Sequence, residues 1–97
     1  MNKFRTYELA KALYQQCKKQ PVKGNVRDQL LRASLSVCLN LIEGSAKPTR
    51  KDRARFYAIA LGSIRETQAI IDLEGLALTN EADIVGAHVY KLLSALS

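Results

Sequence analysis

Apolar residues recur along this chain with the spacing of α-helices. They fall three or four positions apart through residues 4–17, 25–42 and 50–76, and again from about residue 80 to 96. No segment shows the sustained alternation of a β-strand, and no Asn-Gly or Asp-Gly turn joins two apolar runs. The pattern predicts an all-α, antiparallel up-down-up-down four-helix bundle, with residues 1–97 as a single domain.

The segment between the two longest predicted helices is rich in helix-boundary residues. We expect Gly44 to be the left-handed C-terminal cap of the first helix. Pro48 cannot continue a helix and disfavours helical geometry at the residue before it. Thr49 is expected to cap the second helix, with Asp52 three residues later as in a capping box. The chain therefore reverses here, and the two longest helices should lie antiparallel.

Three other positions carry expectations about local structure. Asn25 and Asn80 are expected N-caps of the second and fourth helices. Gly62 lies inside the third helix, where glycine costs about 1 kcal/mol of helix propensity relative to alanine. We expect it where a neighbouring helix approaches closely.

The second and third helices carry more apolar surface than one helix of a small bundle normally hides. The second helix has two apolar stripes, which comprise Val26, Leu30, Ala33, Val37 and Leu41, and then Leu31, Leu35, Cys38 and Ile42. On the third helix, Ile59 and Leu73 widen the apolar surface. A generous core is the ordinary explanation. Because large apolar patches rarely remain exposed, we favour a subunit interface and expect a homo-oligomer.

Positive charge is concentrated in the first half of the sequence. The net charge is +6, with thirteen Lys or Arg against four Asp or Glu in residues 1–55, and two against five in residues 56–97. Two clusters stand out: Lys47, Arg50, Lys51, Arg53 and Arg55 (the 47–55 cluster), and Lys18, Lys19, Lys23 and Arg27 (the 18–27 cluster). In an antiparallel bundle they lie at opposite ends. They are either solvated surface or a phosphate-contacting surface for RNA or DNA, and we favour the second.

No set of residues has the pattern of a catalytic or metal centre. His88 is the only histidine, and Cys17 and Cys38 have no paired spacing, so a zinc site cannot be assembled. We therefore expect no enzymatic activity, no metal and no cofactor, with both cysteines reduced in the core. The first eight residues contain no apolar signal region, and no apolar run approaches a membrane span. We expect a cytoplasmic protein without a membrane partner.

Five polar residues fall on facing positions of the second and third helices. They are Ser36, Asn40, Glu43, Ser63 and Glu66. An acid–base site would need a cleft and a nucleophile or metal beside it. The sequence provides no such partner, so we interpret the set as a structural hydrogen-bond network between the two helices.

The order of residues in these helices resembles the four helix bundle protein family, also called the 23S rRNA intervening-sequence protein family. The likeness is carried by Gln29–Val37, by N-x-x-E-G at Asn40–Gly44, and by G-S-x-x-E at residues 62–66 with Phe56 six residues before the glycine. Leu41 and Ile42 stand where the family more often has Ile and Ala.

The resemblance implies a bundle that assembles into a cyclic pentamer. The family that the chain resembles also includes relatives of the accessory variability protein of diversity-generating retroelements. These relatives bind nucleic acid and a reverse transcriptase. We therefore expect a nucleic-acid-binding accessory protein that contacts the phosphate backbone without reading sequence, with a reverse transcriptase as a further partner. The alternative is a structural or protein-interaction scaffold whose charge only maintains solubility.

Overall fold

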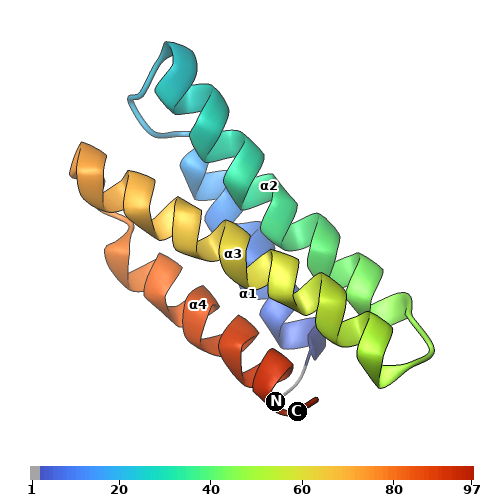
Figure 1. Cartoon of the computed structure of the whole chain (residues 1–97). Coiled ribbons are helices and arrows are strands. Elements are labelled where there is room, and N and C mark those ends of the chain that lie inside the picture. Colours follow the sequence, from blue (N-terminus) through green and yellow to red (C-terminus); the bar gives the residue numbers. More distant parts are fainter. Residues whose placement is uncertain (1–2) are drawn as a thin grey trace.

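The computed structural model describes residues 3–97, so Met1 and Asn2, which begin the segment examined for a signal, lie outside it. The helices are α1 (Lys3–Cys17), α2 (Gly24–Ala46), α3 (Arg50–Glu74) and α4 (Thr79–Ser94). Successive helices run in opposite directions and pack side by side as a bundle (Figure 1). Across the described residues all regular structure is helical, which confirms the all-α fold with four helices.

The core is built from one apolar stripe of each helix. Of the first apolar stripe on α2, Leu30, Ala33, Val37 and Leu41 are buried. They meet Tyr57, Ile64 and Ile71 from α3, Leu13 from α1, and Val85 and Val89 from α4. The second α2 stripe divides: Cys38 is buried, whereas Leu35 and Ile42 are 38% and 48% exposed. The surplus apolar surface expected from the sequence is therefore present on the outside of the subunit.

Gly44 does not cap α2, because the helix continues through it to Ala46. The positive φ angles among the described residues belong to Gly24 and to Gly75, which caps α3 at φ 65°. Gly44 is buried, and a Cβ added there would lie 2.7 Å from Cε1 of Tyr57 and 3.1 Å from Cβ of Phe56. Its missing side chain is thus needed for the close approach of α3, not for a left-handed turn.

The rest of the turn after Gly44 has the conformation that the sequence predicts. Lys47, before Pro48, is extended with φ −78° and ψ 139°. The Asp52 backbone N–H donates to Oγ1 of Thr49 at 3.1 Å, which confirms Thr49 as the N-cap of α3. The turn therefore starts two residues later than Gly44 but is closed by the expected cap.

The other two expected caps are wrong. The N-cap positions of α2 and α4 are Lys23 and Leu78, and neither makes a side-chain capping bond. Leu78 is 3% exposed, so the start of α4 is fixed by burial of an apolar side chain and not by a polar cap. The third and fourth helices also end earlier than the periodicity implied, at Glu74 and Ser94.

Gly62 contradicts the expectation of a close neighbour within the subunit. It is exposed, and no atom of the chain would lie within 4 Å of an added Cβ. Its helix-propensity cost therefore has no explanation in the packing of a single copy.

We expect Gly44→Ala to destabilise the protein by about 1–3 kcal/mol, the scale of overpacking a close contact. The added methyl would press on the Tyr57 ring, which is 3% exposed and cannot swing into solvent. Urea unfolding monitored by circular dichroism measures the change. A midpoint equal to or above that of the wild type would contradict the close contact.

Candidate nucleic-acid interface

The 47–55 cluster surrounds one end of the bundle. It begins at Lys47, directly after the end of α2, and runs through the connection into the first turns of α3 (Figure 1). The connection between α1 and α2, which carries most of the 18–27 cluster, lies at the other end of the molecule (Figure 1). The two clusters therefore do not form one surface in a single subunit.

Two arginines of the 47–55 cluster hold the chain together at this end. Nη2 of Arg50 donates to the carbonyl oxygen of Ala95 at 3.0 Å, which links the start of α3 to the end of α4. Nη1 of Arg53 donates to the carbonyl oxygen of Lys47 at 3.4 Å, across the α2–α3 connection. Each guanidinium has further N–H groups beyond the one used.

Two other cations of this cluster, Lys47 and Arg55, lie against the ring of Phe56. The Lys47 ammonium lies 5.0 Å from the ring centroid and the Arg55 guanidinium lies 4.9 Å from it. Lys47 also pairs with Glu43 at 3.5 Å, and Arg55 has a long 4.0 Å contact with Asp52. Lys51 is exposed and makes no ion pair with a described residue, so its charge faces solvent unneutralised.

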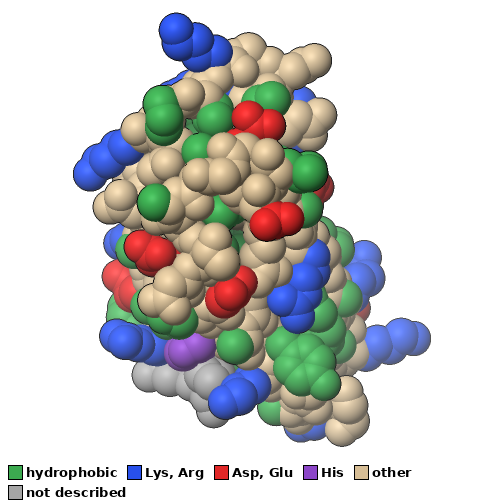
Figure 2. Space-filling model, turned by 90° about the vertical axis from the view of Figure 1, so that its left-hand side faces the viewer, with side chains coloured by type: hydrophobic (Ala, Val, Ile, Leu, Met, Phe, Trp, Pro, Cys, Tyr) green, Lys and Arg blue, Asp and Glu red, His purple; other side chains and the backbone are tan. Residues whose placement is uncertain are grey.

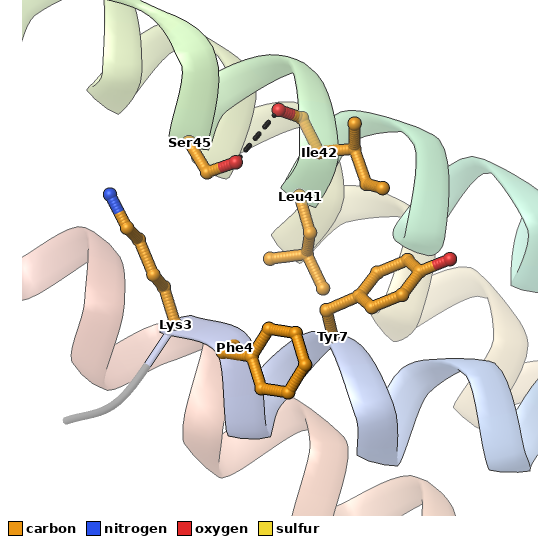
Figure 3. Close-up of a pocket in the computed structure, with 6 residues that line it drawn as sticks. All are labelled: Lys3, Phe4, Tyr7, Leu41, Ile42 and Ser45. Carbon is orange, nitrogen blue, oxygen red and sulfur yellow. Dashed lines mark hydrogen bonds between the residues drawn. The ribbon is translucent and has the colours of Figure 1, made fainter.

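Lys3 adds a cation to the same end, which sequence reasoning missed. A hollow of about 210 Å³ lies between the start of α1 and the end of α2. Lys3 and Ser45 lie at one side of it, and Phe4, Tyr7, Leu41 and Ile42 line the rest (Figure 3). The Ser45 hydroxyl donates to the carbonyl oxygen of Ile42 at 2.9 Å. Only the antiparallel packing brings this N-terminal lysine to the end of α2, so no local sequence signal could have found it.

The residues of the 18–27 cluster make fewer contacts with the rest of the chain than those of the 47–55 cluster. Nη1 of Arg27 donates to the carbonyl oxygen of Lys18 at 3.2 Å, and the Lys18 ammonium lies 5.1 Å from the centroid of the Tyr14 ring. Lys19 and Lys23 are exposed. Arg27 thus closes the α1–α2 connection, while the two other lysines face solvent.

Negative charge lies between the two ends on the face shown in Figure 2. There the carboxylates are spread over the middle of the surface, and basic side chains stand out toward its top and its lower part. This agrees with the acidic balance of residues 56–97, which form most of α3 and all of α4. A polyanion would be repelled from the middle of this face and attracted toward the ends.

The structure brings together part of the expected polar set between α2 and α3. The hydroxyls of Ser36 and Ser63 are 2.7 Å apart, and Nδ2 of Asn40 donates to the carbonyl oxygen and the hydroxyl of Ser36 at 2.9 and 3.1 Å. Thr67, which the sequence reasoning missed, donates to the Ser63 carbonyl oxygen at 2.9 Å. Within this set the hydroxyl pair is the one bond that joins α2 to α3.

Two members of the expected set point elsewhere. Glu43 pairs with Lys47, which directly follows the end of α2, and Glu66 is exposed on α3 with no hydrogen bond to the set. Both lie on the outward arc of their helices, although their spacing places them next to the inward-facing polar residues. The set has the contacts of a structural network and encloses no carboxylate.

The core buries two thiols and the hydroxyl of one tyrosine, whose pKa values are all raised. Cys17 and Cys38 are free and buried, and burial raises the pKa of Cys38 to about 11. Burial also raises the pKa of Tyr57, whose buried hydroxyl has no hydrogen-bond partner among the described residues. His88 approaches Oγ1 of Thr6 at 3.5 Å through Nδ1. Within residues 3–97 no group of three His, Cys, Asp or Glu is placed to hold a metal ion.

The comparisons with known proteins decide the family. The family model described as 23S rRNA-intervening sequence protein matches residues 4–92. The chain belongs to this family. The match extends from the start of α1 into the last turn of α4, and it confirms the resemblance carried by the N-x-x-E-G and G-S-x-x-E segments. No curated protein and no solved structure matches the chain. In the part of this family member that the structure describes, every helix is too short or too polar to cross a membrane.

We expect Asn40→Ala to lower the free energy of unfolding by about 0.5–1.5 kcal/mol, because the hydrogen bonds from Asn40 to Ser36 are lost in a partly buried site. Glu43→Ala is the matched control on the same helix. It removes only an exposed ion pair, so its effect should stay below about 0.5 kcal/mol. Urea unfolding of both variants makes the comparison, and equal effects would place Glu43 inside the network.

We expect the protein to lose stability in alkaline solution. The pKa of the Cys38 thiol is raised from 9.0 to about 11, so between these values the unfolded chain releases a proton that the folded chain retains. Stability is therefore full below about pH 9 and falls above it, by at most about 1.4 kcal/mol per pH unit from this group. Cys17 and Tyr57, whose pKa values are also raised, act in the same direction.

Urea unfolding between pH 8 and 10.5 measures this loss, and Cys38→Ala should reduce it. Both thiols should also resist a thiol reagent at pH 8 until the protein is unfolded. Rapid labelling of the folded protein would contradict their burial.

Proposed function

We propose that this protein is a non-enzymatic, self-associating accessory protein that binds RNA or DNA through the phosphate backbone. The observation that supports it best is the concentration of cations at the α2–α3 end. Five basic residues lie within nine positions there, Lys3 lies beside them, and the carboxylates in contact with them are Glu43 and Asp52. Such a surface attracts phosphate without reading bases.

The arrangement around Phe56 fits this role. Two cations lie 5.0 and 4.9 Å from the centroid of one ring, so their charges are at most about 10 Å apart and both add to the local attraction for a phosphate backbone. Lys51 stands one turn before Arg55 on the exposed side of α3 and adds a third charge. Contacts of this kind depend strongly on salt, because each one releases counterions from the nucleic acid.

Assembly into a ring would repeat this end around one rim. The family resemblance points to a homopentamer, and the surplus apolar surface on α2 and α3 supports self-association. The cytoplasm is the location that we propose from the sequence. The family's description names intervening sequences of 23S rRNA, so structured RNA is the first ligand to test. A role beside a reverse transcriptase in a diversity-generating retroelement is the finer form of the same proposal.

A scaffold without nucleic-acid binding is the second candidate, and one observation favours it. Arg27, Arg50 and Arg53 each donate to a backbone carbonyl of their own chain. These arginines therefore have a structural use that needs no ligand. Lys51, Lys19 and Lys23 have no such use, and they separate the two candidates.

We expect Lys47→Gln/Lys51→Gln to weaken binding to RNA or DNA about tenfold at 100 mM salt. The slope of log Kd against log salt should fall by about 1.4–1.8, the scale of two phosphate contacts. Fluorescence polarisation with a labelled duplex and a labelled single strand measures both quantities. Lys11→Gln/Lys91→Gln is the matched control, because it also removes one lysine paired with a glutamate and one unpaired lysine.

The control should bind like the wild type. Equal losses in the two double variants would mean that net charge alone drives binding. If the wild type binds neither nucleic acid at 50 mM salt, the scaffold without nucleic-acid binding remains as the function.

A further inference from the structure

One stripe on the outer face of α2 is apolar in its middle and charged at its ends. Leu35, Leu39 and Ile42 are 38%, 55% and 48% exposed and lie three or four positions apart. Arg32 stands before them and Glu43 after them, both exposed. Reading along α2, the stripe runs from positive through apolar to negative.

The outer face of α3 carries a second stripe of the same kind. Ile59 is 47% exposed, and Gly62, three residues later, has no atom of its own chain within 4 Å of an added Cβ. Arg55 stands before them and Glu66 after them, both exposed. Within the subunit nothing explains a glycine at this position of a 25-residue helix, since alanine has a higher helix propensity than glycine.

The hydrogen bond between Ser36 and Ser63 sets the level of the two stripes along the bundle. At 1.5 Å per residue, Arg32 lies about 6 Å from that level toward the start of α2, and Glu66 lies about 4.5 Å from it in the same direction. On the other side, Glu43 lies about 10 Å away and Arg55 about 12 Å away.

The apolar centres of the stripes also match in level. Leu39 lies about 4.5 Å below the Ser36–Ser63 bond, between Gly62 at about 1.5 Å and Ile59 at about 6 Å. A large side chain on α2 therefore stands between the height of the bare position on α3 and that of Ile59.

We propose that the outer stripe of α2 in one copy packs against the outer stripe of α3 in the next copy, with the two bundles parallel. This rests on the self-association in the proposed function and names the two surfaces that meet. In this contact Leu39 packs over Gly62 of the second copy, beside its Ile59. Arg32 then faces Glu66, and Glu43 faces Arg55. To form the second pair, Glu43 exchanges Lys47, and Arg55 exchanges Asp52, for the residue of the other copy.

Charge order rejects the flipped form of the same contact. Turning the second bundle upside down would bring Arg32 against Arg55 and Glu43 against Glu66, which places like charges together. A twofold contact between two α2 stripes would also pair Arg32 with Glu43, but it would set large side chains against large ones and leave the α3 stripe exposed.

The parallel contact covers both stripes of every copy with one kind of interface. Because the two surfaces are different, each copy can contact one neighbour through its α2 stripe and another through its α3 stripe. Repeating this contact closes a ring when the rotation between successive copies divides a full turn. The surfaces lie on neighbouring helices, so successive copies turn about an axis instead of stacking in a straight line.

We expect Leu39→Arg and Gly62→Arg each to be folded by circular dichroism but monomeric by analytical ultracentrifugation, at concentrations where the wild type is assembled. Each variant blocks one of the two surfaces and leaves the other intact. An equimolar mixture of the two should therefore form a complex of two chains and no larger species.

Assembly of Gly62→Arg alone would show a twofold α2 contact, and assembly of Leu39→Arg alone would show a twofold α3 contact; either would overturn the proposal. So would a mixture that stays monomeric. A monomeric wild type would remove both this contact and the proposed ring, whereas an assembled wild type that binds no nucleic acid would remove only the proposed binding.

A charge exchange tests the register of the contact. Arg32→Glu and Glu66→Arg should each raise the dissociation constant of the assembly at least tenfold at low salt, and the double variant should recover most of the loss. Lys91→Glu on α4 is the matched control and should leave assembly unchanged. Failure of the double variant to recover would overturn the parallel register.

Discussion

The close approach of α2 and α3 at Gly44 is the constraint on which the rest of the molecule depends. The Tyr57 ring occupies the space that a side chain at Gly44 would fill, so the two longest helices meet at the point where the chain reverses. The hydroxyls of Ser36 and Ser63 then fix their relative height further along. Together these contacts determine which residues are left on the outside of the pair.

This packing also determines where the basic residues lie and what they contact. Thr49 starts α3 directly after the turn, so the basic residues that follow surround the end of the bundle instead of lying along its side. Some of these cations are used to join chain segments, through carbonyl oxygens of Ala95 and Lys47. The remaining positive charge faces solvent at an end, where the carboxylates in contact with it are Glu43 and Asp52.

Much of the fold could be predicted from local spacing, because helix periodicity, a proline and a Thr cap act over a few residues. The role of Gly44 could not, since glycine serves either a left-handed turn or a close contact, and only the position of Tyr57 distinguishes them. The same limit applies to Glu43 and Glu66: spacing placed them near the polar set, but the exact rotation of each helix turns them outward. The sequence shows the two basic clusters as groups of charged residues. The backbone carbonyl groups that their arginines contact depend on the tertiary structure and could not be predicted.

The link from Arg50 to the end of α4, and the hollow that Lys3 shares with Ser45, bring both extremities of the described chain to the cationic end. A fluorescent label or an affinity handle fused to either extremity would therefore crowd that surface and compete with whatever approaches it. Gln20, in the loop at the far end, offers a better attachment point. Immobilisation through that loop would leave the charged rim facing the solution.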